Sequence, residues 1–132
     1  MASIRKTVAL GKPAAEVWAV LRDVGRADRA FPGVLSESRL DEDGVRTVKF
    51  ANGFVAREQL IDVDDNARRI AYSVISGPFT HHHAVMQLID DGDVCRLQWD
   101  SDFLPDAVKE QIEPMVQAGV AAISERFKHR DA

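Results

Sequence analysis

Between residues 34 and 103 the sequence repeats one unit, a run of alternating apolar and polar residues that ends in a cluster of turn-forming residues. The clusters, at residues 41–44, 51–53, 64–66 and 90–93, are rich in Asp, Asn and Gly, which favour tight turns between paired strands. Strands joined by such turns pair antiparallel, because a parallel pair needs a long crossover connection. The sequence therefore predicts an antiparallel meander. Its strands are expected at Val45–Phe50, Phe54–Val63, Arg69–Ser76, Thr80–Ile89 and Val94–Phe103.

Two kinds of element precede this meander. Residues 3–10 alternate with period 2, which predicts a first strand, although Lys6 falls on its apolar face. Pro13 suits the first turn of a helix, where its missing N–H would have had no partner, and Gly25 can end that helix. A second short helix is expected around residues 27–30.

The last predicted element is a long amphipathic helix over Asp106–His129. Apolar or small residues recur in it at spacings of three and four, as on the buried face of a helix. They are Val108, Ile112, Met115, Val116, Gly119, Ala122, Ile123 and Phe127. Pro114 lies inside this pattern and is expected to kink or split the helix, because it removes one backbone hydrogen bond and crowds the preceding turn.

These elements predict an α+β fold in one domain, residues 1–132, with a curved antiparallel sheet of about six or seven strands wrapped around the C-terminal helix. A bent sheet cannot touch one straight helix everywhere, and Gly119 and Ala122 leave space where a larger side chain would close it. This arrangement favours a largely apolar cavity of the kind that binds small molecules. The alternative is that large neighbouring side chains fill the gap.

Composition limits the partners. The net charge is −4 and Lys and Arg are scattered, so no basic stripe exists for nucleic acid. Apolar stretches are only a few residues long, which argues against a transmembrane segment, and residues 1–10 lack the apolar region of a signal peptide. Cys95 is the single cysteine, so no internal disulfide is possible and a cytoplasmic location is expected. No phosphate-binding loop, calcium loop or Ser-His-Asp arrangement is recognised, so no cofactor is predicted.

The order of these elements, with the strings inside them, resembles the START-like (SRPBCC) superfamily with the Bet v 1-like helix-grip fold, in its bacterial polyketide cyclase/dehydrase-like branch. The resemblance covers essentially the whole chain. The strings that carry it are Pro13-Ala14-Ala15-Glu16-Val17-Trp18, Phe31-Pro32-Gly33, Glu58-Gln59-Leu60, Asp64-Asp65, Arg69-Ile70-Ala71-Tyr72-Ser73-Val74, Trp99-Asp100-Ser101-Asp102-Phe103-Leu104-Pro105 and Ile123–Phe127.

The resemblance implies that a ligand lies between the concave face of the sheet and the long helix, and that Glu58 points into that pocket. The turns at Gly53 and at Gly77-Pro78-Phe79 would then lie at its mouth, although both are too short for a hormone-type gate. Because side chains alternate between the two faces of a strand, residues two positions from Glu58 also point inward, and the same alternation selects the inward residues of the other strands. The predicted ligand-binding residues are Val48, Phe50, Phe54, Ala56, Glu58, Tyr72, Val74, His82, Met86, Trp99, Ser101, Phe103, Met115 and Gly119.

Candidate catalytic residues are Glu58, His82 and Tyr72. Glu58 could bind a ligand hydroxyl or act as a general base, or it could form a salt bridge to Arg46 or Lys6 or point outward. His81-His82-His83 cannot all ligate one metal, because adjacent strand residues point to opposite faces, so no metal site is predicted. His82 could reach the pocket rim, or all three histidines could be partly solvated.

Aromatic residues on the inward faces are open to two interpretations as well. Tyr72 and Trp99 could stack on a planar ligand and offer it an O–H and an N–H, or they could be ordinary core residues. Cys95 is expected to be a small buried residue without nucleophilic activity.

Three functions fit these observations. The first is binding or carriage of a small hydrophobic ligand, which is aromatic, polyketide-like or isoprenoid. The second is an aromatase/cyclase or dehydratase-type enzyme without metal or nucleotide cofactor, in which Glu58 moves protons with His82 or Tyr72. The third is a protein-interaction module with a filled interior. The oligomeric state is left open.

Overall fold

The computed structural model describes residues 1–129. Its elements, in chain order, are β1 (Ala2–Leu10), α1 (Ala14–Leu21), η1 (Val24–Arg29), β2 (Leu35–Leu40), η2 (Glu42–Gly44), β3 (Val45–Phe50), β4 (Val55–Asp64), β5 (Arg69–Val74), β6 (His81–Asp90), β7 (Cys95–Leu104), η3 (Asp106–Val108) and α2 (Lys109–Arg126). The predicted combination of an antiparallel sheet, short helices after the first strand and a long C-terminal helix is confirmed.

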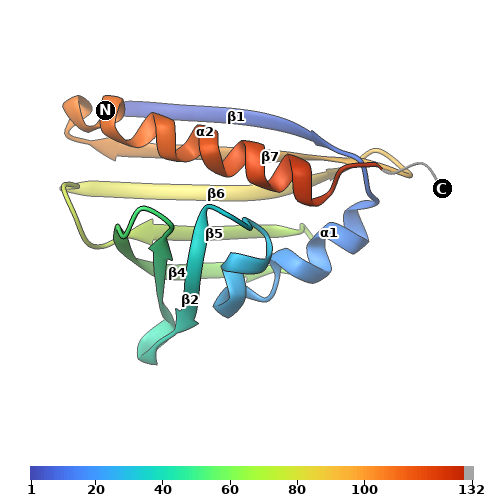
Figure 1. Cartoon of the computed structure of the whole chain (residues 1–132), viewed down its shortest axis with the longest axis horizontal. Helices are drawn as coiled ribbons and strands as arrows, with labels where there is room; N and C mark the ends of the chain where they lie inside the picture. Colours follow the sequence, from blue (N-terminus) through green and yellow to red (C-terminus); the bar gives the residue numbers. More distant parts are fainter. Residues whose placement is uncertain (130–132) are drawn as a thin grey trace.

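One sheet of seven strands contains all the strands of the described region, in the order β1-β7-β6-β5-β4-β3-β2. Each neighbouring pair is antiparallel. Strands β2 to β7 follow one another as the predicted meander, and β1 pairs with the last strand. Helix α2 runs beside β1 and β7 (Figure 1).

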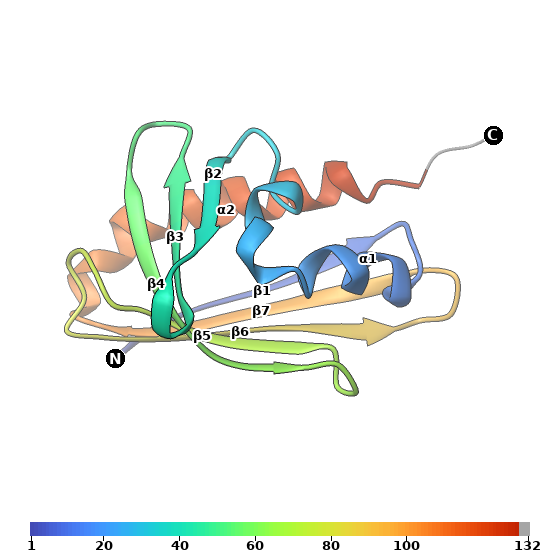
Figure 2. The ribbon, with the colours of Figure 1, turned by 90° about the horizontal axis from the view of Figure 1, so that it is seen from below.

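The sheet is strongly bent, as Figure 2 shows: β2, β3 and β4 rise steeply away from the plane of β5, β6 and β7. Two register shifts accompany this bend, one between Leu60 and Asp62 in β4 and one between Leu35 and Glu37 in β2. An extra residue in one strand increases local twist and bends that strand. The bend gives the sheet the concave face that α2 covers.

The helices differ from the prediction at their ends. Helix α1 ends at Leu21, and Gly25 lies inside the following 3-10 segment η1. Pro13 caps α1 in an extended conformation and does not enter its first turn. The C-terminal helix begins with the 3-10 turn η3 and ends at Arg126.

Of the two outcomes expected at Pro114, a kink or a split, the split was wrong, because α2 continues through that residue. The missing N–H of Pro114 would have bonded four residues back, to Glu110 in the first turn of the helix. Only this bond near the N-terminal end is lost, and the turns from Met115 onward keep their hydrogen bonds. No helix in residues 1–129 is both long and apolar enough to cross a membrane.

Two buried clusters fill the space between sheet and helices. The larger cluster joins α1, the far end of α2 and the middle strands, with Val17, Leu97, Ile123 and Phe127 almost fully buried. The smaller cluster contains Ile4, Phe103, Val108 and Val116. Trp99 packs against both clusters, so its indole ring lies where the two halves of the core meet.

Candidate functional site

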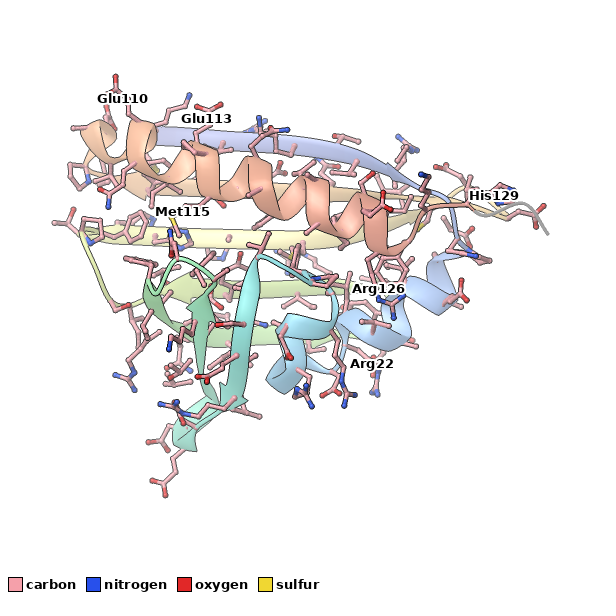
Figure 3. The ribbon with its side chains drawn as sticks, viewed as in Figure 1. Arg22, Glu110, Glu113, Met115, Arg126 and His129 are labelled. Atoms are coloured by element: carbon pink, nitrogen blue, oxygen red, sulfur yellow. The ribbon has the colours of Figure 1, made fainter. Side chains whose placement is uncertain are left out.

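The core contains a cavity with two adjacent lobes between the concave face of the sheet and α2. The first lobe, about 70 Å³, lies toward α1 and η1, and the second, about 80 Å³, lies toward the β5–β6 connection. Both lobes are lined by Phe50, Glu58, Tyr72, Trp99 and Met115. Figure 3 shows Met115 on the side of α2 that faces the cavity, whereas Glu110 and Glu113 lie on the opposite side of the helix, where Glu113 is near Lys6 of β1.

Every predicted ligand-binding residue except Phe103 lines one of the lobes. The side chain of Phe103 is fully buried in the smaller core cluster, where it contacts Phe79 at a ring-centroid distance of 5.8 Å. Several other residues that line the lobes were not predicted from the sequence. The most important of these are Phe31, Arg46, Phe79, Ile112 and Val116. The helical spacing that selected Met115 also placed Ile112 and Val116 on the same face of the helix, and it could have found both.

The two lobes of the cavity are small. Each lobe has less volume than the roughly 150 Å³ apolar cavity that accommodates benzene in an engineered protein. The expected space beside Gly119 is occupied, because a Cβ atom there would lie 3.0 Å from Cζ3 of Trp99. A larger residue at position 119 therefore requires the indole of Trp99 to shift, so most of the space expected there is taken by that ring.

A buried ion pair forms one wall of the cavity. Arg46 in β3 and Glu58 in β4 are directly opposite each other in the register, and Nε of Arg46 donates to Oε1 of Glu58 at 2.8 Å. The two residues are only 7% and 9% exposed. Nη1 of Arg46 also donates to the backbone carbonyl of Val24 at 3.2 Å.

This pair decides between the predicted salt-bridge partners of Glu58, and its role toward a ligand stays a prediction. The carboxylate forms the salt bridge to Arg46 and also lines both lobes of the cavity. Lys6, the other predicted partner, lies instead near Glu113 of α2, with 3.7 Å between Nζ and Oε1.

Tyr72 and Trp99 extend the polar wall. The indole N–H of Trp99 donates to the hydroxyl oxygen of Tyr72 at 3.1 Å, and the guanidinium of Arg46 lies 5.3 Å from the centroid of the Tyr72 ring. Burial, reinforced by the Glu58 carboxylate, raises the pKa of Tyr72 above its ordinary value. The phenol therefore keeps its proton at neutral pH and can donate it.

His82 closes the second lobe at the end of the sheet. The paired residues of β5 and β6 end with Tyr72 opposite Ala84. Beyond this point, hydrogen bonds that involve side chains connect the two segments. The backbone N–H of Val74 donates to Nδ1 of His82 at 2.9 Å, and the hydroxyl of Ser73 donates to the carbonyl of His82. Burial, with smaller contributions from His83 and His81, lowers the pKa of His82 to about 4.

The expectation that all three histidines are partly solvated was wrong for His82. Its side chain is buried and lines the second lobe, whereas His81 is exposed on the opposite face of β6. Within residues 1–129, no group of three or more His, Cys, Asp or Glu side chains is arranged to hold a metal ion.

The two turns expected at the mouth of the pocket lie side by side. Phe54 and Phe79, one from each turn region, both line the second lobe. Cζ of Phe54 lies 3.9 Å from the position that a Cβ atom would take on Gly77. Phe79, Val74 and His82 also line an open surface hollow of about 670 Å³, so this end of the cavity is separated from solvent by few side chains.

A family model described as "Polyketide cyclase / dehydrase and lipid transport" matches residues 1–130. The chain belongs to this family. The predicted resemblance to the polyketide cyclase/dehydrase-like branch of the START-like superfamily is thereby confirmed. No curated protein matches the chain.

Solved structures share the fold of this family member over nearly its whole length. A protein from Thermobifida fusca is 27% identical with a TM-score of 0.79, and the match covers 100% of this chain and 99% of that one. An uncharacterised protein from Bacillus thuringiensis is 20% identical with a TM-score of 0.84, covering 96% and 98%. Norcoclaurine synthase from Thalictrum flavum, solved with dopamine and hydroxybenzaldehyde, is 19% identical with a TM-score of 0.72, covering 99% and 89%.

Proposed function

We propose that this polyketide cyclase/dehydrase family member is a single domain that binds a small hydrophobic ligand between the sheet and α2. Its one free cysteine, Cys95, suggests that it does so in the cytoplasm. The observation that carries the proposal is the Arg46–Glu58 pair, a buried ion pair that faces a largely apolar cavity.

Stability alone gives little reason for such a pair. Replacing a buried ion pair by well-packed apolar residues is often neutral or stabilising, because removing two charges from water is costly. Ligand sites, in contrast, combine mainly apolar walls with a few polar groups that orient the bound molecule. Glu58, Arg46, Tyr72 and Trp99 form such a polar group among the aromatic and aliphatic walls of the cavity. A module with a filled interior is less well supported, since both lobes stay open.

Native mass spectrometry tests the proposal directly. Protein purified gently from its own host, without detergent, should carry a discrete extra mass that is lost on denaturation. The ligand should be displaced in a variant whose cavity is filled, and Ala56→Leu, at a buried residue lining the second lobe, is designed for that purpose. Ala118→Leu, on the exposed side of α2, adds the same atoms outside the cavity and should keep the ligand.

Two results would argue against binding. One is an unliganded mass together with no increase in melting temperature from a panel of aromatic and isoprenoid compounds. The other is equal ligand retention in Ala56→Leu and Ala118→Leu, which would place the ligand outside the cavity.

A second candidate function is a cyclase or dehydratase-type reaction. The observation in its favour is that a carboxylate, Glu58, and a protonated phenol, Tyr72, line the same two lobes. Such a pair can accept a proton and donate one. His82 is poorly placed for the base role, because its Nδ1 already accepts from Val74. If the protein is an enzyme, Glu58→Gln should abolish turnover of the ligand found by mass spectrometry, whereas in a carrier it would change affinity alone.

A further inference from the structure

The charges around the cavity restrict the chemical class of its ligand. Of the residues in the described range 1–129, Arg46 and Glu58 are the only ionised side chains that line the two lobes. Their charges cancel, and each nitrogen of Arg46 already makes one contact, Nε and Nη2 with Oε1 of Glu58 and Nη1 with the carbonyl of Val24. Among residues 1–129, the lobes therefore offer an acidic ligand no uncompensated positive charge.

The polar atoms of the cavity that still lack a hydrogen-bond partner among the described residues can instead bind a neutral polar group of a ligand. Both close contacts from Arg46 go to Oε1 of Glu58, and among the hydrogen bonds of residues 1–129 none reaches Oε2, which leaves an acceptor. Tyr72 uses its oxygen to accept from Trp99, so its own O–H is left as a donor. In the β4–β5 register Glu58 is opposite Val74 and Tyr72 is opposite Leu60, which makes Glu58 and Tyr72 diagonal neighbours on one face.

A single hydroxyl group satisfies both atoms. Diagonal neighbours across a strand pair are roughly 7–8 Å apart at the backbone, within the reach of long side chains that converge on one group. A ligand hydroxyl can donate to the carboxylate and accept from the phenol at the same time. Around this polar point the walls are aromatic, with Phe31 and Trp99 rings 5.6 Å apart and Phe50 and Phe54 rings 5.7 Å apart.

From these contacts we infer that the Arg46–Glu58 pair makes the cavity selective for uncharged, hydroxylated aromatic molecules and excludes carboxylates such as fatty acids. A carboxylate head would lose its hydration, face the lone pairs of Oε2 and find no free cation, which is the costly case of a buried unpaired charge. A phenol brings no charge at neutral pH and leaves neither polar atom unpaired. The inference rests on the proposed function, because it concerns what the same cavity binds.

The test uses two probes of similar size, 4-methylphenol and 4-methylbenzoate, titrated into isotope-labelled protein at neutral pH and followed by two-dimensional NMR. Resonances of cavity residues report the site of binding as well as the affinity. In the wild type the phenol should bind at least about tenfold more tightly than the benzoate, the scale set by an uncompensated buried charge.

Glu58→Gln supplies the decisive comparison. It keeps the shape of the side chain but removes the negative charge, which leaves Arg46 as an uncompensated cation, so the order of affinities should reverse in favour of 4-methylbenzoate. Glu16→Gln, an equal change of charge at an exposed position of α1, should leave the order unchanged. Tyr72→Phe removes the donor, and with it the acceptor of the Trp99 N–H, but changes no charge. It should weaken phenol binding by about two- to tenfold without helping the benzoate.

The outcomes separate the two proposals. If 4-methylbenzoate binds the wild type as well as the phenol, or if Glu58→Gln leaves the preference unchanged, the selectivity is wrong while ligand binding stands. If Glu58→Gln unfolds, Tyr72→Phe decides alone, and equal phenol affinity in that variant would overturn the inference. If neither probe shifts a cavity resonance of the wild type, the inference is overturned, while native mass spectrometry decides separately whether the cavity binds another hydrophobic ligand.

Discussion

The backbone N–H of Val74 donates to Nδ1 of His82 at 2.9 Å, so a titratable side chain stands in for a main-chain acceptor at the point where β5 and β6 separate. This bond requires the unprotonated form of Nδ1. The groups that act on this imidazole are His83 and His81, which lower its pKa, and Asp102, which raises it. Burial of the imidazole is the largest of these effects, and it also lowers the pKa.

The first prediction follows from the pKa of His82. That pKa is about 4 in the folded protein against an ordinary 6.5, so between these values the unfolded chain binds a proton that the folded chain does not. His82 therefore adds stability that is fully present above pH 6.5 and is lost as the pH falls toward 4. The loss should approach roughly 3 kcal/mol, measured by urea unfolding across this pH range.

His82→Asn is the informative variant, because its amide oxygen can accept from Val74 without titrating. It should flatten the pH dependence between 4 and 6.5, whereas His81→Asn on the exposed face should not. An unchanged slope in His82→Asn would mean that other groups cause the acid sensitivity.

The second prediction concerns the Arg46–Glu58 pair. Glu58→Leu leaves Arg46 buried without a counter-charge and should lower the free energy of unfolding by about 3–5 kcal/mol. The double variant Arg46→Met/Glu58→Leu removes both charges and should recover most of that loss, as judged by urea unfolding. Arg39→Met breaks the exposed pair with Asp41 and should cost at most about 1 kcal/mol. Additive losses in the double variant would contradict this account.

The third prediction concerns the contact between Gly119 and Trp99. Gly119→Leu forces the indole away from α2 and should destabilise the protein by about 1–3 kcal/mol, the usual effect of overpacking. Trp99 should also change its fluorescence, since its ring and its bond to Tyr72 must move. Ala118→Leu, the adjacent exposed position, is the matched control. Wild-type stability and fluorescence in Gly119→Leu would show that the ring has room to move.

The fourth prediction concerns Cys95, which is 1% exposed and whose thiol has its pKa raised by burial. A thiol-specific reagent such as dithionitrobenzoate should react with the native protein only at the rate of unfolding. In denaturant the same thiol should react at once, which serves as the internal control. Rapid labelling of the native protein would show that the β7 end of the core opens.

The inward face of the sheet was predictable because the pleat enforces a period of 2. Once Glu58 was placed inward by resemblance, Ala56 and Phe54 followed, and Tyr72 and Trp99 followed on neighbouring strands. The partner of Glu58 was not predictable in the same way, because Arg46 and Lys6 both face inward and only the strand order decides between them. That order puts Arg46 opposite Glu58 and Lys6 opposite Trp99 at the far side of the sheet.

Two predictions were wrong, the space beside Gly119 and the solvation of His82. Both depend on contacts between residues that are distant in sequence. A glycine in a helix predicts space, but whether that space is empty depends on Trp99, which comes from another element. The burial of His82 depends on β5 ending at Val74 and not at Ser76, as the sequence suggested. Strand ends depend on partner geometry, which a local pattern does not contain.

The pairing of β1 with β7 sets the order in which this fold can assemble. Strands β2 to β7 pair with neighbours a short turn away, whereas Ala2 in the first strand pairs with Phe103 in the last strand of the sheet. Closing so long a loop costs more entropy than closing a hairpin, so local pairs form first. During synthesis the first strand leaves the ribosome without a partner, and its edge stays unpaired until residues 95–104 have been made.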